Sequence, residues 1–334
     1  MATIGNTVAT LADIAKRMDP NNKIARVIEL LGQTNEMLED MMFKEGNLPT
    51  GHRTTVRTGL PTVYWRLLNK GVPSSKSLTA QVDEQCGMLE SRSEVDKDLA
   101  MLNGNTAEFR LSEGQAFIEA MNQEMQQTMV YGNSGTAPEE FTGFAPRFST
   151  ISGANNGSHI LNAGGVGSDN SSIWLVVWGD LTCHGLYPAG SEAGLIHQDL
   201  GEQTVIEATG IGASKFQALC DRWQWKCGLV VKDWRYVVRI ANIDVSNLVA
   251  SSNAADLIEL MIKAIHRIPS LRMGRPAFYM NRTVFEMLDI QSRNAVIAGG
   301  QLGYRDVFGS SVLSFRGIPL RKIDQLLETE AVVA

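Results

Sequence analysis

The run Gly210-Ile211-Gly212-Ala213-Ser214-Lys215 is a candidate nucleotide-binding loop. It follows a strand-like run and opens a stretch, 214–222, that we predict to be helical, which is the setting of a dinucleotide-binding fingerprint. Lys215 stands where that fingerprint has its third glycine, and the loop lacks the spacing of a P-loop. We interpret the loop as a turn, and a nucleotide-binding enzyme is kept as a remote alternative.

Cysteine and histidine side chains could hold a metal ion, but their spacing argues against it. Cys220 and Cys227 have six residues between them, which does not suit a zinc knuckle, and Cys183-His184 lies well upstream. We expect small buried hydrophobes at these cysteines, and reduced thiols there and at Cys86. The remaining histidines form no metal-ligand spacing either: His52, His159, His197 and His266.

Nucleophilic catalysis finds no support in the sequence. Gly132-Asn133-Ser134-Gly135 lacks the spacing of a nucleophile elbow. The aromatic cluster Trp223, Trp225 and Trp234 is more typical of a core or an interface than of a ligand cage. No set of nucleophile, base and orienting group emerges. We therefore predict that the protein is not an enzyme and needs no cofactor and no metal.

Composition and charge narrow the class of partner. The chain has 334 residues, of which 44% are hydrophobic and 20% charged, as in an ordinary globular protein of one or two domains. Its net charge of −6 argues against broad binding to a phosphate backbone. The most hydrophobic run, 173–178, is far shorter than the roughly 20 residues that span a bilayer. We expect a protein without a membrane segment that is made in a cytoplasm.

Helical patterns recur along the chain. Apolar residues at helical spacing mark two stretches, 8–18 and 24–38, that are too short to be stable unless they dock on something. A longer helix is predicted over 112–131, because Ser112 and Gln115 form a capping box and Gly132 supplies the stop. Its apolar residues repeat every four positions: Phe117, Met121, Met125 and Met129. Asn253 with Asp256 predicts the start of another helix.

Strand-like runs fill much of the remainder. They lie at 173–178, 203–208, 228–241, 277–280, 312–315 and 318–323. The run at 277–280 leads directly into a helix that starts near Asn281. The Gly-, Asn- and Ser-rich stretch 153–172 is expected to be a loop. Together these patterns predict a mixed α+β protein.

Residues 51–82 predict a hairpin with two long arms joined by a turn at 71–75. Each arm has about 15 residues, or roughly 50 Å at 3.3 Å per residue, whereas a compact chain of this length has a radius of gyration of about 20 Å. An isolated two-stranded hairpin is barely stable in water. We therefore expect the hairpin either to fold into a sheet of its own domain or to project and be covered by a neighbouring molecule.

Charge is segregated along this region. Residues 51–82 contain five basic side chains and no acidic one: Arg53, Arg57, Arg66, Lys70 and Lys76. Residues 83–108 contain seven acidic side chains against only two basic ones, Arg92 and Lys97; the seventh is Glu108, and the other six lie within 83–98: Asp83, Glu84, Glu90, Glu94, Asp96 and Asp98. We interpret the five basic residues and these last six acidic ones as candidate inter-subunit contacts, in which Arg57 and Arg66 meet the acidic segment of a neighbour. One alternative is a hairpin with solvated charges. The other, ranked lowest, is a grip on nucleic acid through Tyr64 and Trp65.

Several unusual stretches resemble the major capsid proteins of epsilon15-like short-tailed bacteriophages. They are residues 45–61 (EGNLPTGHRTTVRTGLP), 82–89 (VDEQCGML), 141–148 (FTGFAPRF) and the sequence around Trp178-Gly179-Asp180, His184-Gly185 and Tyr187-Pro188. The strand-to-helix step at 279–283 and the closing strand at 315–320 are similar to those of tailed-phage capsid subunits more widely. The likeness runs over nearly the whole chain.

The resemblance implies the α+β fold of Hong Kong 97-type capsid proteins. It would make 1–45 an N-terminal arm and 46–92 an extended β-hairpin loop. Residues 93–240 would form a peripheral domain with a spine helix at 112–131. An axial domain would follow at 241–310, and closing strands at 311–334 would return to the peripheral domain.

The resemblance also implies a function in self-assembly. Pentamers and hexamers of the subunit would build an icosahedral phage head in the bacterial host cytoplasm, in the company of portal, scaffold and decoration proteins. The head would enclose double-stranded DNA without sequence-specific binding, which suits a net acidic wall. An encapsulin-like cellular compartment, which shares the shell fold but encloses enzymes, is the nearest alternative.

Overall fold

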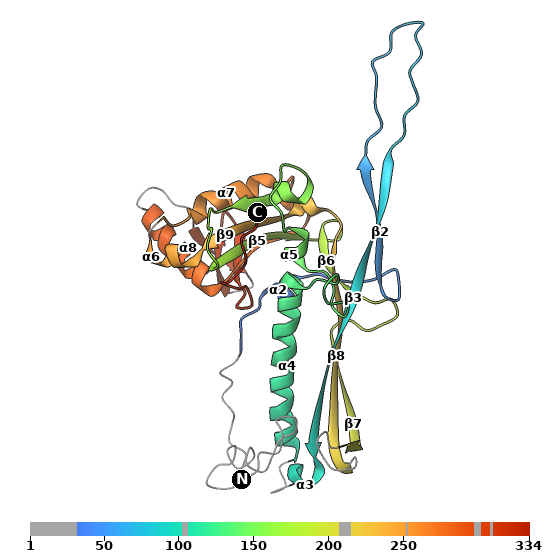
Figure 1. Cartoon of the computed structure of the whole chain (residues 1–334), viewed down its shortest axis with the longest axis vertical. Coiled ribbons are helices and arrows are strands. Elements are labelled where there is room, and N and C mark those ends of the chain that lie inside the picture. Colours follow the sequence, from blue (N-terminus) through green and yellow to red (C-terminus); the bar gives the residue numbers. More distant parts are fainter. Residues whose placement is uncertain (1–31, 102–105, 207–214, 252, 297–301, 308–309) are drawn as a thin grey trace.

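The computed structural model describes residues 32–101, 106–206, 215–251, 253–296, 302–307 and 310–334. The molecule is elongated (Figure 1): a head of sheet and helices lies to one side, a limb of one long helix and long strands runs down from it, and a hairpin projects the other way. None of the described helices is long and apolar enough to cross a membrane.

The strands, in chain order, are β1 (Phe43–Glu45), β2 (Gly51–Gly59), β3 (Leu78–Asp96), β4 (Ile160–Asn162), β5 (Asn170–Trp178), β6 (Cys183–Tyr187), β7 (Leu195–Ile206), β8 (Lys215–Val231), β9 (Val237–Asp244), β10 (Arg275–Met280), β11 (Leu302–Val307), β12 (Ser310–Phe315) and β13 (Ile318–Lys322). The α-helices are α2 (Met37–Asp40), α3 (Lys97–Ala100), α4 (Thr106–Tyr131), α5 (Phe144–Arg147), α6 (Val245–Ala250), α7 (Leu257–Arg267) and α8 (Arg282–Val296). Short 3-10 helices are η2 (Asn155–His159), η3 (Trp234–Tyr236) and η4 (Leu271–Met273).

One continuous sheet joins the three parts of the molecule. Its strand order is β11-β12-β13-β10-β5-β6-β8-β3-β2, with β1, β4, β7 and β9 attached at the side. The head contains β5, β9 and β10 to β13 with α5 to α8; the limb contains α3, α4, β7, β8 and the second half of β3. The hairpin consists of β2 and the first half of β3, and we call the connection at 60–77 its tip.

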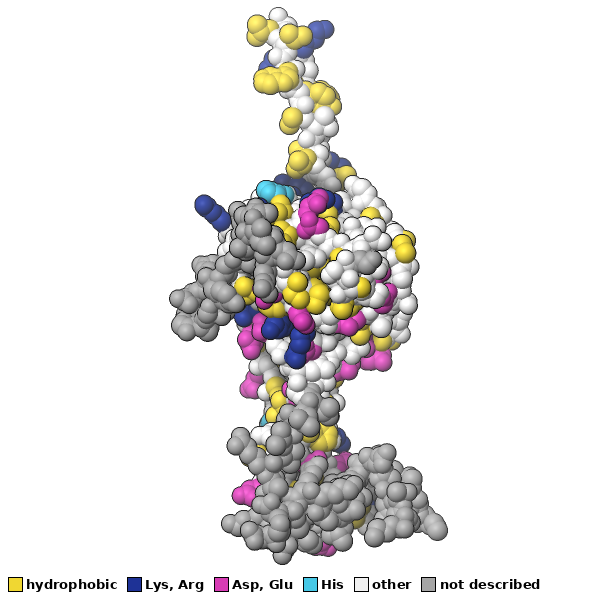
Figure 2. All heavy atoms as spheres, turned by 90° about the vertical axis from the view of Figure 1, so that its left-hand side faces the viewer, with side chains coloured by type: hydrophobic (Ala, Val, Ile, Leu, Met, Phe, Trp, Pro, Cys, Tyr) yellow, Lys and Arg dark blue, Asp and Glu magenta, His cyan; other side chains and the backbone are white. Residues whose placement is uncertain are grey.

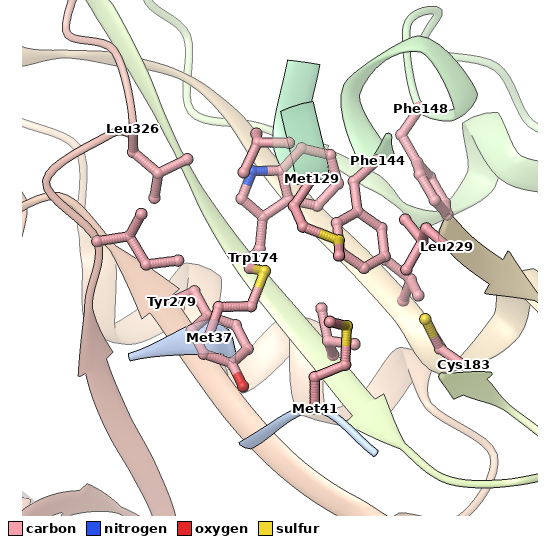
Figure 3. Packing of buried hydrophobic residues seen from close by; sticks show 14 of the residues in the cluster. Met37, Met41, Met129, Phe144, Phe148, Trp174, Cys183, Leu229, Tyr279 and Leu326 are labelled. Carbon is pink, nitrogen blue, oxygen red and sulfur yellow. The ribbon is translucent and has the colours of Figure 1, made fainter. Parts of the chain in front are cut away.

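Strand β5 is the centre of the head, and all nine of its residues are buried. Side chains of a strand alternate between faces, so Trp174, Val176 and Trp178 enter one core and Ile173, Leu175 and Val177 another. The first core also contains Met129 from the end of α4 and Phe144 from α5, as Figure 3 shows. The second is covered by α7 and α8. A strand buried on both faces accounts for its unbroken apolar run.

A buried polar network ties the end of α4 to the head. Arg239 on β9 donates to Glu330 over 2.8 Å, and both side chains are at most 5% exposed. Glu330 also accepts from the hydroxyl groups of Tyr131 (2.5 Å) and Ser172. A buried charge must be paired and hydrogen-bonded to be tolerated, and this pair is. The network fixes α4, β5, β9 and the closing segment relative to one another.

The limb is built on two long elements. Helix α4 has 26 residues, or about 39 Å at 1.5 Å per residue, and β3 has 19, or roughly 63 Å. The half of β3 from Cys86 to Asp96 pairs with β8, and β8 pairs in turn with β7. The other half pairs with β2. One strand therefore belongs to both the limb and the hairpin.

Several predicted elements are found in place. Helix α4 ends at Tyr131, before Gly132, where a Cβ would lie 2.6 Å from two carbonyl oxygens. Asp256 caps α7 by accepting from the Glu259 amide. The strand-to-helix step is formed by β10 and α8, and the two closing strands are β12 and β13. The predicted helix at 8–18 and most of that at 24–38 lie outside the described residues, and 37–40 form a single helical turn.

Helix α4 begins six residues before the predicted start. Its first residue is Thr106, so Ser112 and Gln115 lie inside the helix and are not its cap. The capping-box spacing also occurs by chance within helices, because serine and glutamine tolerate helical positions. The spine helix therefore spans 106–131, where the sequence predicted 112–131.

The predicted helix at 214–222 is wrong, because Lys215–Val231 is the strand β8. Apolar residues at 216, 219, 220 and 223 fit helical spacing, which made the sequence ambiguous. In the structure this segment is paired on both sides, with β3 and with β7. Pairing on both edges overrides a weak local preference for helix.

Two further segments differ from the sequence prediction. The run at 228–241 is two strands, the end of β8 and the start of β9, separated by η3. The stretch 153–172 is not only a loop, because it contains η2 and β4, and its last three residues open β5. Glycine and asparagine there serve local hydrogen bonds, such as that from the Asn170 side chain to the Gly167 carbonyl at 2.7 Å.

Candidate inter-subunit surface

The hairpin is regular only in its first half. Strands β2 and β3 pair from Gly51 opposite Gln85 to Gly59 opposite Leu78, and the tip beyond forms no strand. The turn lies at 67–70, where the Lys70 amide donates to the Leu67 carbonyl over 3.2 Å, so the predicted turn at 71–75 is displaced. Pro61 and Pro73 flank this turn, and proline has no N–H to give to a ladder.

The tip exposes a concentration of large apolar side chains. Trp65 is fully exposed (104%), and Leu68, Val63, Leu60 and Leu67 are 73–92% exposed. Figure 2 shows hydrophobic side chains spaced along the projecting hairpin, with Lys and Arg side chains near its far end. An exposed apolar patch of this kind marks a surface that another molecule covers. The sequence analysis named Trp65 only for stacking and missed the leucines and valine, although all are visible in the sequence.

The base of the hairpin is held firmly to the body. Glu84 is buried and forms a bidentate salt bridge with Arg147, in which the two guanidinium nitrogens lie 2.6 and 2.7 Å from the two carboxylate oxygens. The Asn47 side chain bonds both backbone groups of Arg53, at 2.7 and 2.8 Å. Gly51 has no room for a side chain, because a Cβ there would lie 2.0 Å from the Glu84 carbonyl oxygen. The tip therefore projects from a fixed base.

Most of the acidic candidates already have partners within the chain. Asp83 accepts from Arg53 across the hairpin at 2.7 Å, and this hydrogen bond lowers the pKa of Asp83. Glu90 accepts from Arg222 at 2.7 Å, which lowers the pKa of Glu90. Asp96 caps α3 by accepting from the Asp98 amide. In the described part of the chain, Glu94 and the Asp98 carboxylate are left without an ion pair.

The basic candidates also divide into residues that are paired within the chain and residues that are not. Arg53 is used inside the hairpin, whereas Arg57, Arg66, Lys70 and Lys76 form no ion pair with any residue that the structure describes. Arg66 donates to the Lys70 carbonyl over 2.9 Å, which shapes the turn but leaves its charge unbalanced. Within one chain the structure joins Arg53 to Asp83, and it does not bring Arg57 or Arg66 to an acidic residue. Four unbalanced positive charges thus lie on a projecting element.

Two histidines meet at the hairpin base, a pair that the sequence analysis missed because they are 132 positions apart. The rings of His52 (β2) and His184 (β6) lie edge to face, with centroids 6.1 Å apart. The Nδ1 atoms of both are buried and accept or donate no hydrogen bond in the structure. Burial, followed by the charge of Lys232, lowers the pKa of His184 to about 4.

The other chemical candidates are not assembled into a site. Residues 210–214 of the glycine loop lie outside the described residues, and Lys215 opens a strand where a nucleotide-binding loop would need a helix. Cys220 and Cys227 are seven positions apart on β8, or about 23 Å. All four cysteines are free thiols. Among the residues described, no three potential metal ligands cluster.

Comparison with known proteins identifies this architecture. Residues 19–334 match the family model described as major capsid protein GP7. The chain belongs to this family of major capsid proteins. A comparison with curated proteins found no match.

Three solved structures resemble the chain to different degrees, and the first agrees with the family. A chain in the structure of bacteriophage epsilon15 is 34% identical to this capsid subunit, with a TM-score of 0.79, and the alignment covers 100% of the subunit and 99% of that chain. The capsid of bacteriophage JBD30 is 10% identical, with a TM-score of 0.47 over 89% and 93%. An encapsulin from Synechococcus elongatus is 10% identical, with a TM-score of 0.42 over 70% and 96%.

The fold and the place of action follow from the family and the epsilon15 match. The subunit has the α+β fold of Hong Kong 97-type capsid proteins, is a shell protein of a phage head and resides in the virion. The likeness to the encapsulin is too weak to bear on function. The family is structural, and its members act by building a shell.

Proposed function

We propose that the capsid subunit forms pentamers and hexamers of an icosahedral head that encloses double-stranded DNA, with no catalytic step. The projecting hairpin is the observation that carries this proposal. Seven large apolar residues of its tip are exposed, five of them by more than 70%, and no described part of the same chain covers these five. A hairpin of this kind gains stability only when a neighbouring molecule covers it.

The proposed partners are other copies of the subunit, together with the portal, scaffold and decoration proteins that complete the head. The net charge of −6 supports a wall that holds DNA without binding its sequence, because a strongly basic surface would grip the phosphate backbone.

We propose the domain division on the boundaries predicted from the sequence: an arm at 1–45, an extended loop at 46–92, a peripheral domain at 93–240, an axial domain at 241–310 and closing strands at 311–334. Helices α6 to α8 lie in the axial segment and cover one core of the head, which supports that boundary. The closing strands have contacts with both domains. β13 pairs with β10 of the axial segment, and Glu330 bonds Tyr131 and Arg239 of the peripheral segment.

We further propose that Arg57 and Arg66 contact an acidic surface of a neighbouring subunit. Four of the six acidic residues first considered as partners are satisfied inside their own chain, so they are poor partners for a second copy. Glu94 and Asp98 remain available. Repeated at every contact of a closed lattice, even a small favourable term accumulates, while facing like charges cost several kcal/mol.

The test is the double variant Arg57→Glu/Arg66→Glu. Electron microscopy and sedimentation should show that it forms no closed shells, while its melting temperature stays near that of the wild type. Arg272→Glu/Arg275→Glu is the matched control, because both of these exposed arginines lie in the head and the change in net charge is the same. Normal shells from the hairpin variant would refute the contact. A large fall in its melting temperature would show that these arginines stabilise the subunit itself.

A further inference from the structure

The hairpin leaves the body at a junction where β3 changes its partner. Cys86 of β3 pairs with Gly228 of β8, and the residue before it, Gln85, pairs with Gly51 of β2. Beyond Gly228, β8 continues beside β6. In the described sheet no ladder joins β2 to β6. Side chains therefore make the contact between the hairpin strand β2 and the body strand β6.

Two histidines form this contact. His52 is the second residue of β2 and His184 the second of β6, and their rings lie edge to face with centroids 6.1 Å apart. His184 is only 1% exposed, and the Nδ1 atoms of both rings are buried without a hydrogen bond. A buried polar atom without a partner costs free energy. Packing alone therefore holds the two rings together.

The surroundings of the two rings have no carboxylate to spare for a proton. Four charged groups face the rings, from β1, β3, the turn between β5 and β6, and the end of β8: Lys44, Glu84, Asp180 and Lys232. Asp180 is already shared by Lys44 at 2.6 Å and Lys232 at 3.4 Å. Glu84 is taken by the bidentate salt bridge with Arg147. A second positive charge on either ring would thus be uncompensated.

Acid therefore favours separation of the rings. Burial, followed by the charge of Lys232, lowers the pKa of both histidines, that of His184 to about 4. A ring released into water has a pKa of about 6.5. Between these values the separated state binds a proton that the packed state does not bind, so the separated state gains as pH falls. From pH 7.5 to pH 5 its ratio to the packed state rises roughly 25-fold through His184 alone.

We propose that the contact between His52 and His184 is a pH-sensitive fastening of the hairpin, which protonation opens so that the hairpin can swing about the junction in β3. The Glu84–Arg147 salt bridge still holds the β3 side of the junction when β2 is released. The swing is a property of the single subunit. Its consequence for shells rests on the proposed function, because a hairpin that reaches a neighbour must be held at a fixed angle.

A distance measurement on the unassembled subunit tests this directly. Nitroxide labels on Leu60→Cys, at the start of the tip, and Val249→Cys, on α6, both lie at exposed sites. Double electron–electron resonance should show one narrow distance distribution at pH 7.5 and a broad one at pH 5. The unlabelled-site background comes from the wild type, in which three cysteines are buried and Cys86 is partly buried.

The double variant His52→Asn/His184→Asn should keep the narrow distribution at both pH values. His159→Asn is the matched control: His159 is also buried with an unbonded Nδ1, but it packs on Trp234 in the head, so this variant should broaden as the wild type does. Broadening of the double variant at pH 5 would refute the proposal, as would a narrow distribution of the wild type at pH 5. If the double variant melts far below the wild type at pH 7.5, His52→Asn, at the less buried ring, replaces it.

Two charge variants should move the pH of broadening in opposite directions. Lys232→Gln removes a positive charge that faces both rings and should shift the midpoint to lower pH, whereas Asp180→Asn removes a negative one and should shift it to higher pH. Shifts in one direction, or none, would contradict the electrostatic cause. The yield of shells from the wild type should fall between pH 7.5 and pH 5 and that from the double histidine variant should not. Absence of shells from the wild type at every pH would overturn the proposed function and leave the distance test standing.

Discussion

Two tryptophans show how differently the head and the hairpin tip are stabilised. Trp174 in β5 is completely buried, packs against Phe144 and Phe148, and has the Arg239 guanidinium 5.1 Å from its ring centroid. Trp65 at the tip is completely exposed. The head is held together by contacts that one chain supplies to itself. If the tip is covered by a neighbouring molecule as proposed, its residues should act on shell formation and not on the stability of the subunit.

The largest expected effect is the difference in subunit stability between removing the Trp174 side chain and removing the Trp65 side chain. Trp174→Ala should lower the free energy of unfolding of the unassembled subunit by about 3–5 kcal/mol, because it leaves a cavity in a packed core. Trp65→Ala should change it by no more than about 0.5 kcal/mol and should reduce shell formation. Urea unfolding followed by tryptophan fluorescence, beside sedimentation, checks both. Equal losses of stability would show that the tip folds onto its own subunit.

The next effect concerns the ion pair that joins the closing segment to the head. Glu330→Ala should cost about 3 kcal/mol or more, because it leaves Arg239 buried without a partner. The exposed pair Arg282–Asp324 provides the contrast, and Arg282→Ala should cost less than about 1 kcal/mol. Thermal unfolding of both variants measures the difference. A small effect at Glu330 would show that water or another group compensates Arg239.

The free energy of unfolding is expected to depend on pH because of a histidine at the hairpin base. The pKa of His184 is lowered to about 4, against about 6.5 in an unfolded chain. Below about pH 6.5 the unfolded chain binds a proton at His184 that the folded chain does not yet bind. The free energy of unfolding therefore keeps its full value above about pH 6.5 and falls as the pH drops toward 4. A tenfold change in proton affinity corresponds to about 1.4 kcal/mol, so the full loss is on the order of 3 kcal/mol.

The groups that face His184 are Lys232, His52, Asp180 and Lys44. The free energy of unfolding of the wild type and of His184→Asn, measured from pH 7.5 to pH 4, should differ most at the acid end, where the variant loses less. Parallel pH profiles would show that His184 titrates normally.

The smallest expected effect lies on α4. Phe117 is only half-buried and stacks on Trp223, while Met121 is 3% exposed. Phe117→Ala should therefore cost about 2 kcal/mol, below the roughly 3–5 kcal/mol of a fully buried aromatic residue. Met121→Ala, measured in the same denaturant series, should cost at least as much. An unchanged midpoint for Phe117→Ala would place its stabilising contact in the assembly.

The sequence predicts best where a local signal and the tertiary structure agree. The end of α4 at Gly132, the Asp256 cap and the step from β10 to α8 rest on local chemistry, and they are found as predicted. Residues 215–222 have apolar positions that fit either period, and pairing with two distant strands decides for β8. That information is not local, so the sequence of this segment alone does not contain it.

The candidate inter-subunit surface could be predicted only in part, because some of its residues pair with segments that are distant in the sequence. The length of its arms allowed a projecting hairpin and the charge pattern made it basic, but neither showed that Asp83, Glu84 and Glu90 would be used within the chain. The partners of Glu84 and Glu90, Arg147 and Arg222, come from segments more than 60 positions away. The limb also has a groove of about 460 Å³ between α4 and the β7–β8 pair, which forms only when these distant segments come together.

Strand β3 has a mechanical consequence for a filled head. It runs unbroken from the hairpin into the limb, so a pull on the tip passes along covalent bonds into the limb sheet. There it is resisted by eleven residue pairs with β8, from Cys86 opposite Gly228 to Asp96 opposite Ala218. A force along the strand axis loads all of these pairs together, whereas a force across the strands would open them one at a time. If neighbouring subunits hold the hairpin tips as proposed, tension between subunits of the head would load this sheet in its strongest direction.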